Sequence, residues 1–319
     1  MTQEVFHTAE YGSVAVLVPC YNEAITIAKV CDDFRRCLPD ADIYVYDNNS
    51  SDGTAQIAAE HGAIVRHEPR QGKGHVVRQM LRDIDADYFI MVDGDDTYPA
   101  ESAGDLLRPL ISGEADMCVG DRLSNGTYGQ ENDRAFHGFG NDLVRVLIKL
   151  IYGFKFSDVM TGYRSFNRMF AETMPVLSPG FEIETELSIH AVDKGWKIAE
   201  VPIDYRDRPE GSESKLSTFS DGFKVLKMIM SLFKDYRPMA LFGWLSLIFV
   251  VLGLIVGLPV VFEFAQTGLV PRLPSAVLAV GLVFTGLLSM TCGLILDTVV
   301  KGTRKEYELQ VLEVYRSHQ

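Results

Sequence analysis

The sequence lacks the cysteine patterns that mark disulfide scaffolds and zinc proteins. It has five cysteines in 319 residues, and they form neither a C-x-x-C pair nor a zinc-ligand spacing. An odd, scattered set is typical of reduced thiols in a cytosolic compartment, where cysteine serves as a small buried apolar residue. We therefore expect neither a disulfide framework nor a zinc site. Internal repeats and low-complexity segments are absent as well.

Positive charge is also scarce. The chain has 30 lysines and arginines against 43 aspartates and glutamates, which gives a formal net charge of -13. This balance argues against nucleic acid as a partner, because a nucleic-acid-binding surface is basic. Anionic substrates must therefore meet local basic patches or a metal ion.

Two functional signals are incomplete. Gly72-Lys73-Gly74 resembles the end of a phosphate-binding loop, but no Ser or Thr follows the lysine and the upstream glycine is missing. This argues against an ATPase. Residues 1–11 are polar and lack the apolar segment of a signal peptide, so we expect none at this end.

Charge is missing altogether from two long apolar runs near the C-terminus, 241–262 and 274–296. As helices they would be roughly 33–35 Å long, enough to cross a bilayer core of about 30 Å. The short connection 263–273 predicts a hairpin. Two buried core helices are the alternative, but these runs are long for that. Lysines and arginines lie on both outer flanks, whereas the connection holds only Arg272. The positive-inside rule then places the globular domain and both termini in the cytoplasm, at a cell membrane that the chain crosses twice.

The preceding stretch, 219–236, alternates apolar and basic residues. This pattern predicts a helix that lies along the membrane surface. An ordinary amphipathic helix packed on the globular domain is the alternative. A final helix is expected near 306–315, and no role for it follows from the sequence.

The first part of the chain alternates short apolar runs with helical patterns, which predicts a parallel doubly wound sheet. Strands are expected at 14–18, 43–46, 63–67, 88–92, 117–119 and 196–203. Helices are expected at 24–37, 55–60, 72–84, 101–111, 136–152 and 181–194, and a loop at 124–133. The alternating acids within 181–187 would by themselves favour a strand.

Polar clusters follow three of these strands, at 19–23, 47–54 and 93–96. The carboxyl ends of parallel strands share one sheet edge, so the clusters predict a nucleotide-sized cleft there. Glu23 and Asp47 could accept hydrogen bonds from a base or ribose. Asp93 and Asp95 are spaced to reach one hard cation, Mg²⁺ or Mn²⁺, completed by phosphate oxygens, although a solvated acidic turn is the alternative. For the Asp52 and Thr54 side chains we favour a helix N-cap.

In this order the motifs resemble family 2 glycosyltransferases with the GT-A fold. The motifs are Pro19-Cys20-Tyr21-Asn22-Glu23, the run 47–54, and Asp93-Gly94-Asp95. The match continues through Gly162-Tyr163-Arg164 and 208–215. It is then similar to the branch of dolichyl-phosphate mannose synthase and bacterial polyprenyl-phosphate glycosyltransferases. About 240 residues are covered, and the hairpin is similar to that of the anchored members.

The resemblance implies an α/β protein with four parts. These are a GT-A (Rossmann-like, mostly parallel) domain at 1–218, an amphipathic interface helix at 219–238, two transmembrane helices within 239–300, and a cytoplasmic tail at 301–319. It implies inverting transfer of a sugar from a nucleotide sugar, with UDP favoured over GDP, to undecaprenyl or dolichyl phosphate with the help of Mg²⁺ or Mn²⁺. Oligomeric state stays open, although hairpins of this kind often associate.

The resemblance also implies roles for individual residues. Asp93, Asp95, Arg122 and Arg164 would be catalytic, with Asp95 the firmer metal ligand, Asp93 nearer the ribose, and the two arginines candidates for binding the acceptor phosphate. The nucleotide would be bound by Pro19, Tyr21, Glu23, Asp47, Asn49, Lys73 and Asp93. Glu184, at the start of a helix, would contact the sugar. The lipid phosphate would be bound by Arg208, Ser214 and Lys215. The family pattern R-x-x-G-x-S-K has one extra residue here, so Ser212 and Ser214 both remain candidates for its serine.

Two other functions are alternatives. A processive polysaccharide synthase would carry a Q-x-x-R-W motif and more membrane-spanning helices, but neither Trp196 nor Trp244 follows an arginine. A membrane-tethered protein that binds a nucleotide sugar without turnover stays open, and a turnover assay would distinguish it from an enzyme.

Overall fold

The computed structural model describes residues 5–124, 145, 146, 148–150, 152–209 and 237–318. The chain divides into two compact units, 1–218 with 311–319 and 219–310. The predicted surface helix at 219–236 and all but the first residue of the predicted loop 124–133 lie outside the described residues. The helix predicted at 136–152 is described only in part, from residue 145, and is helical at 145, 146 and 148–150.

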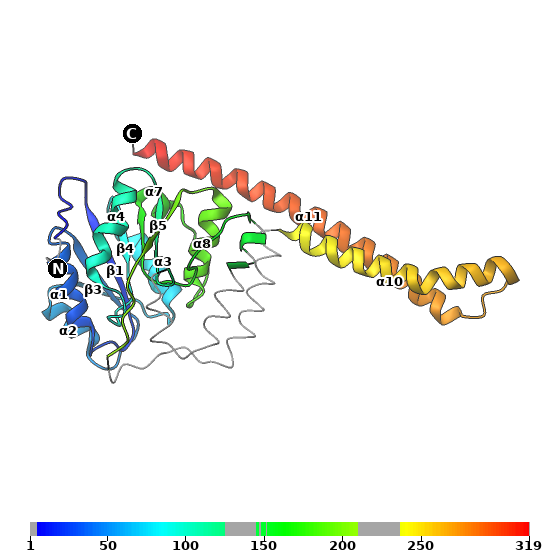
Figure 1. Cartoon of the computed structure of the whole chain (residues 1–319), viewed down its shortest axis with the longest axis horizontal. Coiled ribbons are helices and arrows are strands. Elements are labelled where there is room, and N and C mark those ends of the chain that lie inside the picture. The colour runs from blue at the N-terminus through cyan, green and yellow to red at the C-terminus, as the bar shows by residue number, and fades with distance from the viewer. Residues whose placement is uncertain (1–4, 125–144, 147, 151, 210–236, 319) are drawn as a thin grey trace. The chain divides into compact units, whose positions relative to one another are not determined.

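The first unit is built on a seven-stranded sheet with the order β3-β2-β1-β4-β6-β5-β7 (Figure 1). All strands run parallel except β6, which is antiparallel to both β4 and β5. The strands are β1 Val14–Cys20, β2 Asp42–Asp47, β3 Ile64–His67, β4 Tyr88–Met91, β5 Met117–Asp121, β6 Arg164–Asn167 and β7 Ile198–Pro202.

Helices lie on both faces of this sheet (Figure 1). Every residue of β1 is buried, which is why this strand is an almost unbroken apolar run and not an alternating one. The helices are α1 Ile27–Cys37, α2 Thr54–Glu60, α3 Lys73–Asp83, α4 Ala103–Ile111 after a short 3-10 turn Ala100–Ser102, α7 Arg168–Thr173 and α8 Ile183–Lys194. The stretch with alternating acids therefore begins a helix, as the family resemblance implied.

The sequence predicted six of the seven strands but missed β6 and the helix α7 that follows it. β6 reads Arg-Ser-Phe-Asn and has no apolar run, so nothing local marks it as a strand. It forms because β4 and β5 each offer it an open edge. The sheet is therefore mostly parallel, as the family resemblance implied, with one antiparallel strand that the alternation of strands and helices did not predict.

The strand order changes direction between β1 and β4. β2 and β3 continue from one side of β1, whereas β4 pairs with its other side. Open α/β sheets bind ligands at the carboxyl ends of the strands at such a switch point. Because β6 runs the other way, its first residue, Arg164, pairs with Met91 at the end of β4. The start of β6 therefore lies at the edge where the parallel strands end.

His190 of α8 gives the first unit a testable pH dependence. It is buried with its ring 5.8 Å from that of Phe170, and burial, with Lys194 nearby, lowers the pKa of His190 from about 6.5 to about 3. The folded chain keeps this ring neutral, whereas the unfolded chain protonates it below pH 6.5. Stability is therefore lost as the pH falls through the interval between the two pKa values, by about 2 kcal/mol at pH 5.

We expect His190→Gln to melt at nearly the same temperature at pH 7 and pH 5, because a glutamine at position 190 does not titrate between these pH values. The wild type should melt several degrees lower at pH 5 (about 2–4 °C per kcal/mol for a unit of this size). Circular dichroism of the two proteins side by side checks this. Equal shifts in both proteins would assign the acid sensitivity to other groups.

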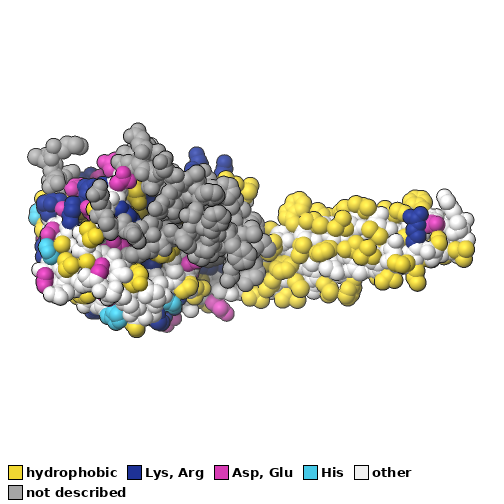
Figure 2. Space-filling view, turned by 90° about the horizontal axis from the view of Figure 1, so that it is seen from below, with side chains coloured by type: hydrophobic (Ala, Val, Ile, Leu, Met, Phe, Trp, Pro, Cys, Tyr) yellow, Lys and Arg dark blue, Asp and Glu magenta, His cyan; other side chains and the backbone are white. Residues whose placement is uncertain are grey.

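The described part of the second unit is a hairpin of α10 Pro238–Thr267 and most of α11 Leu273–Ser317, whose residues from 311 on are grouped with the first unit. Both helices are long and apolar enough to cross a membrane. Both predicted apolar runs are thus helical, and α11 continues without a break through the helix expected at 306–315. Figure 2 shows the described surface of the hairpin covered by hydrophobic side chains, as expected for helices that face lipid.

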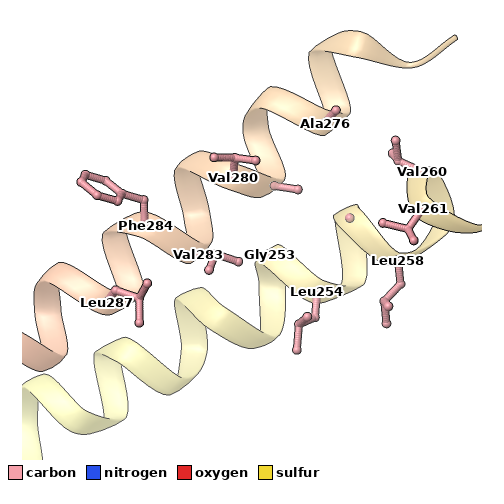
Figure 3. A pocket seen from close by; sticks show the side chains of 12 residues that line it. Gly253, Leu254, Leu258, Val260, Val261, Ala276, Val280, Val283, Phe284 and Leu287 are labelled. Carbon is pink, nitrogen blue, oxygen red and sulfur yellow. The ribbon is translucent and has the colours of Figure 1, made fainter. Parts of the chain in front are cut away.

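Small residues hold the two helices together. A Cβ added to Gly253 would lie 2.7 Å from Val283, and one added to Gly286 would lie 2.8 Å from Val250. Close backbone approach of this kind is how membrane helices gain packing without a hydrophobic driving force. Nearer the connection the helices leave an apolar groove of about 470 Å³, lined by side chains such as Leu258 and Val280 (Figure 3).

Candidate active site

The backbone is strained at the ends of the three central strands. Among the described residues, the non-glycine residues with positive φ are Asn22 (54°), Asn49 (67°) and Asp96 (59°). They follow β1, β2 and β4 respectively, within a few residues. Asn and Asp tolerate this region better than other side chains do, and such strain concentrates at functional sites. The backbone itself therefore marks the edge that the sequence predicted as a cleft.

The loops after β1 and β2 are joined by hydrogen bonds. The Asn22 N–H donates to Ser50 Oγ at 2.8 Å, and the Asn22 carbonyl Oδ1 accepts from the Ser51 N–H at 2.8 Å. The Glu23 N–H donates to Thr54 Oγ1 at 2.8 Å. Asp52 accepts from the Ala24 N–H at 3.0 Å. These bonds make one rigid wall out of two loops.

The predicted capping role of Asp52 and Thr54 is therefore corrected. The N-cap of α2 is Gly53, at φ 89°, and no side chain caps the helix there. The Asp52 carboxylate accepts from Thr54 Oγ1 at 2.5 Å and Thr54 N at 3.1 Å, and both side chains reach back to the β1 loop.

Asp47, the last residue of β2, presents a buried acceptor. Asp47 is 6% exposed, and Oδ2 accepts from the Ser50 N–H at 3.2 Å and lies 3.5 Å from His67 Nδ1. Oδ1 is buried and has no hydrogen-bond partner in the part of the chain that the structure describes. Leaving a buried acceptor unpaired is costly, so such an atom indicates a place for a donor on a ligand. His67, which the sequence did not single out, lies at this position.

The next residue, Asn48, fixes the loop between β3 and α3. Its amide donates to the carbonyls of Glu68 and Arg70, each at 2.8 Å, and its Oδ1 accepts from the Gly72 N–H at 2.7 Å. This places the N-terminus of α3, with Lys73, beside the β2 and β4 ends. The sequence marked Asn48 only as a turn residue, because its partners are distant backbone groups.

Asp95 is the most enclosed acid of the β4 loop, at 3% exposed. Its Oδ1 accepts from Thr97 Oγ1 at 2.6 Å and from the Thr97 N–H at 3.2 Å, while its Oδ2 pairs with the Arg208 guanidinium. Burial, reinforced by the nearby charge of Asp93, raises the pKa of Asp95, and Arg208 opposes the rise. The carboxylate is thus oriented by Thr97 and needs a cation opposite Oδ2.

Asp93 pairs with Lys73, which also bonds Glu184 Oε1 at 2.5 Å. The Lys73 side chain is 7% exposed. Its burial acts to lower its pKa, but the charges of Asp93 and Glu184 prevail and raise it. Burial raises the pKa of Glu184, against the opposing charge of Lys73. A buried lysine therefore ties together the two acids predicted to bind the donor and the sugar.

Gly162 sets the position of Asp93. A Cβ at this residue would lie 2.5 Å from Asp93 Oδ2, and the Gly162 N–H donates to the Tyr98 hydroxyl at 2.9 Å. We expect Gly162→Ala to displace Asp93 and to lower kcat/KM of the transfer reaction at least tenfold (about 1.4 kcal/mol). Its melting curve should still show a cooperatively folded domain. Steady-state kinetics and a melting curve check both parts.

Gly180→Ala is the matched control. An added Cβ there meets only the far end of the flexible Glu182 side chain. Wild-type kinetics for Gly162→Ala would show that Asp93 tolerates displacement, contrary to this expectation.

Two of the arginines predicted to be catalytic and to bind the acceptor phosphate are engaged by other groups of the protein in this structure. Arg122 forms a two-point ion pair with buried Asp158 at 2.6 and 3.0 Å, and lies 5.5 Å over the Tyr205 ring. Arg164 is fully buried and donates to the carbonyls of Thr161 and Val159 at 3.0 and 2.6 Å. Burial lowers the pKa of Arg164 to about 10. In this structure both arginines therefore hold the walls of the site together, and their role at the acceptor phosphate stays a prediction.

The other predicted residues lie along the same edge or outside the described part. Pro19 is buried within β1, and Tyr21 and Glu23 follow in its loop, with Tyr21 exposed. The Asn49 amide donates to the Pro69 carbonyl at 3.0 Å, so it also braces the wall. Ser214 and Lys215 lie outside the described residues. Sequence reasoning missed Tyr98 and Asp158, whose partners are far away along the chain.

Asp93 and Asp95 could hold a divalent cation only if a bound substrate supplied further coordinating atoms. No group of three or more His, Cys, Asp or Glu side chains among the described residues could hold a metal ion alone. Two carboxylates on one loop, each paired with a cation in this structure, match the donor set that Mg²⁺ or Mn²⁺ completes with phosphate oxygens and water.

The sequence profile of glycosyl transferase family 2 matches residues 15–174. Glycosyltransferase AglJ of Haloferax volcanii is 33% identical over 295 residues, which cover 92% of this chain and 96% of that protein. A dolichyl-phosphate hexose transferase of the same organism is 31% identical over 227 residues, covering 71% of this chain and 96% of that protein.

The fold is also found among solved structures. Glucosyl-3-phosphoglycerate synthase from Mycobacterium tuberculosis, solved with Mn²⁺, UDP-glucose and phosphoglyceric acid, matches with a TM-score of 0.55 at 22% identity, over 70% of this chain and 79% of that chain. The predicted GT-A class, with a C-terminal pair of long apolar helices, is thereby confirmed. The profile match and the alignment to AglJ over nearly the whole chain lead to one conclusion: this protein belongs to glycosyl transferase family 2 and is a glycosyltransferase.

Proposed function

We propose that this glycosyltransferase moves a sugar from a UDP-linked donor to a polyprenyl phosphate, with inversion, at the cytoplasmic face of a membrane. The dolichyl-phosphate hexose transferase among its relatives supports the acceptor class. The UDP-glucose in the structural neighbour supports the donor class. The two apolar helices support a site held close to lipid.

The observation that carries the donor proposal is the spacing of two acids along one sheet edge. Asp47 ends β2 and Asp95 follows β4, with only β1 between these strands. Adjacent strands lie about 4.8 Å apart, so the two positions are separated by about 10 Å across the sheet. A nucleoside diphosphate can span this distance, with an N–H of the base on the unpaired Asp47 Oδ1 and the diphosphate near Asp95. Pro19, Tyr21, Glu23 and Asn49 would line the nucleoside side.

Asp95 and Asp93 would hold Mg²⁺ or Mn²⁺ together with the diphosphate. When bound, the ion supplies neutralisation of the charge that develops on the leaving diphosphate. Thr97 orients Asp95 for this purpose through its 2.6 Å hydrogen bond. Lys73 holds Asp93 and Glu184 together, so Glu184 would contact sugar hydroxyls from a fixed position.

The acceptor phosphate needs alignment and not a strong base. A phosphate monoester is largely doubly ionised near neutral pH, because its second pKa lies near 6. Its oxygen can attack the anomeric carbon directly if it is held in line with the leaving group. Arg208, together with Ser214 and Lys215 from the sequence motif, would hold it, since a guanidinium matches phosphate oxygens in two-point contacts.

The proposed organisation follows the sequence boundaries. Residues 1–218 would form the catalytic domain, 219–238 an interface helix, 239–300 the membrane hairpin, and 301–319 a cytoplasmic tail. A hairpin anchor would keep the long apolar tail of the lipid in the bilayer while its phosphate reaches the basic loop. Arg208 and Lys215 lie shortly before the interface helix in the sequence.

Product formation from a panel of labelled nucleotide sugars tests the proposal. The purified full chain is given undecaprenyl or dolichyl phosphate with Mg²⁺ or Mn²⁺, and a parallel reaction contains a chelator. A metal-dependent, lipid-extractable product with inverted anomeric configuration is expected. Nucleotide-sugar binding without any product would reject the transfer reaction for these acceptors and favour a tethered binding protein.

A further inference from the structure

Asp93 and Asp95 each face a cation, but the two cations are held differently. The Lys73 side chain is 7% exposed and is fixed between Asp93 and Glu184. The Arg208 side chain is 31% exposed and comes from the segment after β7. The positive charge on Asp95 is therefore the more accessible of the two, and it is the one that can be exchanged.

The segment that carries Arg208 is bonded to the end of β5 and to the residues after β4. The Ile203 N–H donates to the Asp121 carbonyl at 2.9 Å, and the Arg206 N–H donates to the Thr97 carbonyl at 2.9 Å. The Arg206 guanidinium bonds Glu101 at 3.0 Å. The two main-chain hydrogen bonds set the backbone that leads to Arg208, so that the Arg208 guanidinium reaches Asp95.

The two oxygens of Asp95 have separate tasks. Oδ1 accepts from Thr97, and Oδ2 faces the Arg208 guanidinium. A cation that coordinates Asp95 without breaking the Thr97 bond must use Oδ2. Arg208 and a divalent ion would therefore approach the same oxygen, and the repulsion between two positive charges at one oxygen favours exchanging one for the other.

We propose that Arg208 is an exchangeable counter-ion of Asp95, which the divalent cation displaces as it arrives with the nucleotide sugar. This rests on the proposed metal role of Asp95. A buried carboxylate without a cation is strongly unfavourable, so the guanidinium balances the charge of Asp95 and orients its side chain before the donor binds. After the exchange, the freed guanidinium turns to a phosphate oxygen. Arg208 would thus make the acceptor-binding charge available only once the donor and its metal are in place.

The proposal predicts that Arg208 weakens metal binding to the free protein. We expect Arg208→Gln to bind Mn²⁺ about tenfold more tightly than the wild type without nucleotide, the usual size of a competitive coupling between two ligands. Arg208→Lys keeps the positive charge and should bind Mn²⁺ nearly as the wild type does. Arg206→Gln is the matched control, because its guanidinium bonds Glu101, and it should leave the affinity unchanged.

Electron paramagnetic resonance of free Mn²⁺, titrated with the purified full chain, measures these affinities without any need for turnover. Adding Asp95→Asn to Arg208→Gln should abolish the tightened binding. Wild-type or weaker affinity in Arg208→Gln would overturn the exchange, as would tight binding that survives in the double variant. A melting curve of each variant shows that it is folded.

The lipid-transfer assay of the wild type separates this proposal from the proposed function. If Arg208→Gln binds Mn²⁺ more tightly but the wild type gives no lipid product, the exchange is supported and the polyprenyl phosphate is rejected as the acceptor. Lipid product together with unchanged Mn²⁺ affinity would reject the exchange and leave the transferase intact.

Discussion

Asp95→Asn should lower the rate of sugar transfer at least about a thousandfold. Loss of the metal-neutralised diphosphate removes several kcal/mol of transition-state stabilisation, and each 1.36 kcal/mol corresponds to about a factor of ten. The loss should fall on kcat more than on KM of the acceptor, because Asp95 acts on the leaving group. The variant should fold normally, since burial already acts against the charged form of Asp95 and raises its pKa.

The control is the neighbouring acid. Asp96 pairs with Lys29 at 2.6 Å, and it occupies a positive φ that asparagine also tolerates. Asp96→Asn should therefore keep transfer within a few-fold of the wild type. Initial rates of lipid-product formation at saturating Mn²⁺ make the comparison. If Asp95→Asn retained a tenth of the wild-type rate, Asp95 would not be the ligand on which the chemistry depends.

Lys73→Met should destabilise the catalytic domain strongly. It leaves Asp93 and Glu184 close together without the cation that bridges them. Breaking a buried ion pair by removing one partner costs about 3–5 kcal/mol. For a unit of this size we expect the melting midpoint to fall by about 10 °C. Transfer activity should fall as well, because Asp93 and Glu184 lose their fixed positions.

A second variant identifies the cause of this loss. Glu184→Gln added to Lys73→Met removes one of the two unpaired charges, so it should recover part of the melting midpoint. Lys29 is the matched control, since it also lies between two acids, Asp33 and Asp96, but its side chain is 51% exposed. Lys29→Met should cost less than about 1 kcal/mol. If Lys73→Met and Lys29→Met melted alike, burial of the ion pair would not be what matters.

The order of the motifs along the chain was enough to identify the fold class and the family. Short apolar runs followed by turn residues indicated β1 to β5 and β7. The reason is clearest in β1, which is buried along its whole length and must therefore be apolar throughout. Charge-free runs of membrane length indicated the hairpin. Asp93 and Asp95 could be selected because their spacing on one strand end is a local property.

The contacts between segments could not be read from the sequence. β6 has no strand pattern and exists because β4 and β5 pair with it, and its reversed direction brings Gly162 against Asp93. The partners of Arg122 and Arg164, whose charge suggested phosphate binding, could not be read from the sequence either. Only the fold shows that Asp158 and main-chain carbonyls already engage them.

The sequence by itself therefore determined residue types and their local spacing. It places two carboxylates two positions apart, an acid at the end of a second strand, and two charge-free runs long enough to cross a membrane. The tertiary structure decided which charges are enclosed and which are accessible. Lys73 is enclosed between Asp93 and Glu184, whereas Arg208 reaches Asp95 from an accessible segment. A side chain's charge is fixed by its residue type, but its partners depend on burial and on residues more than a hundred positions away along the chain, as Lys73 with Glu184 and Asp95 with Arg208 both show.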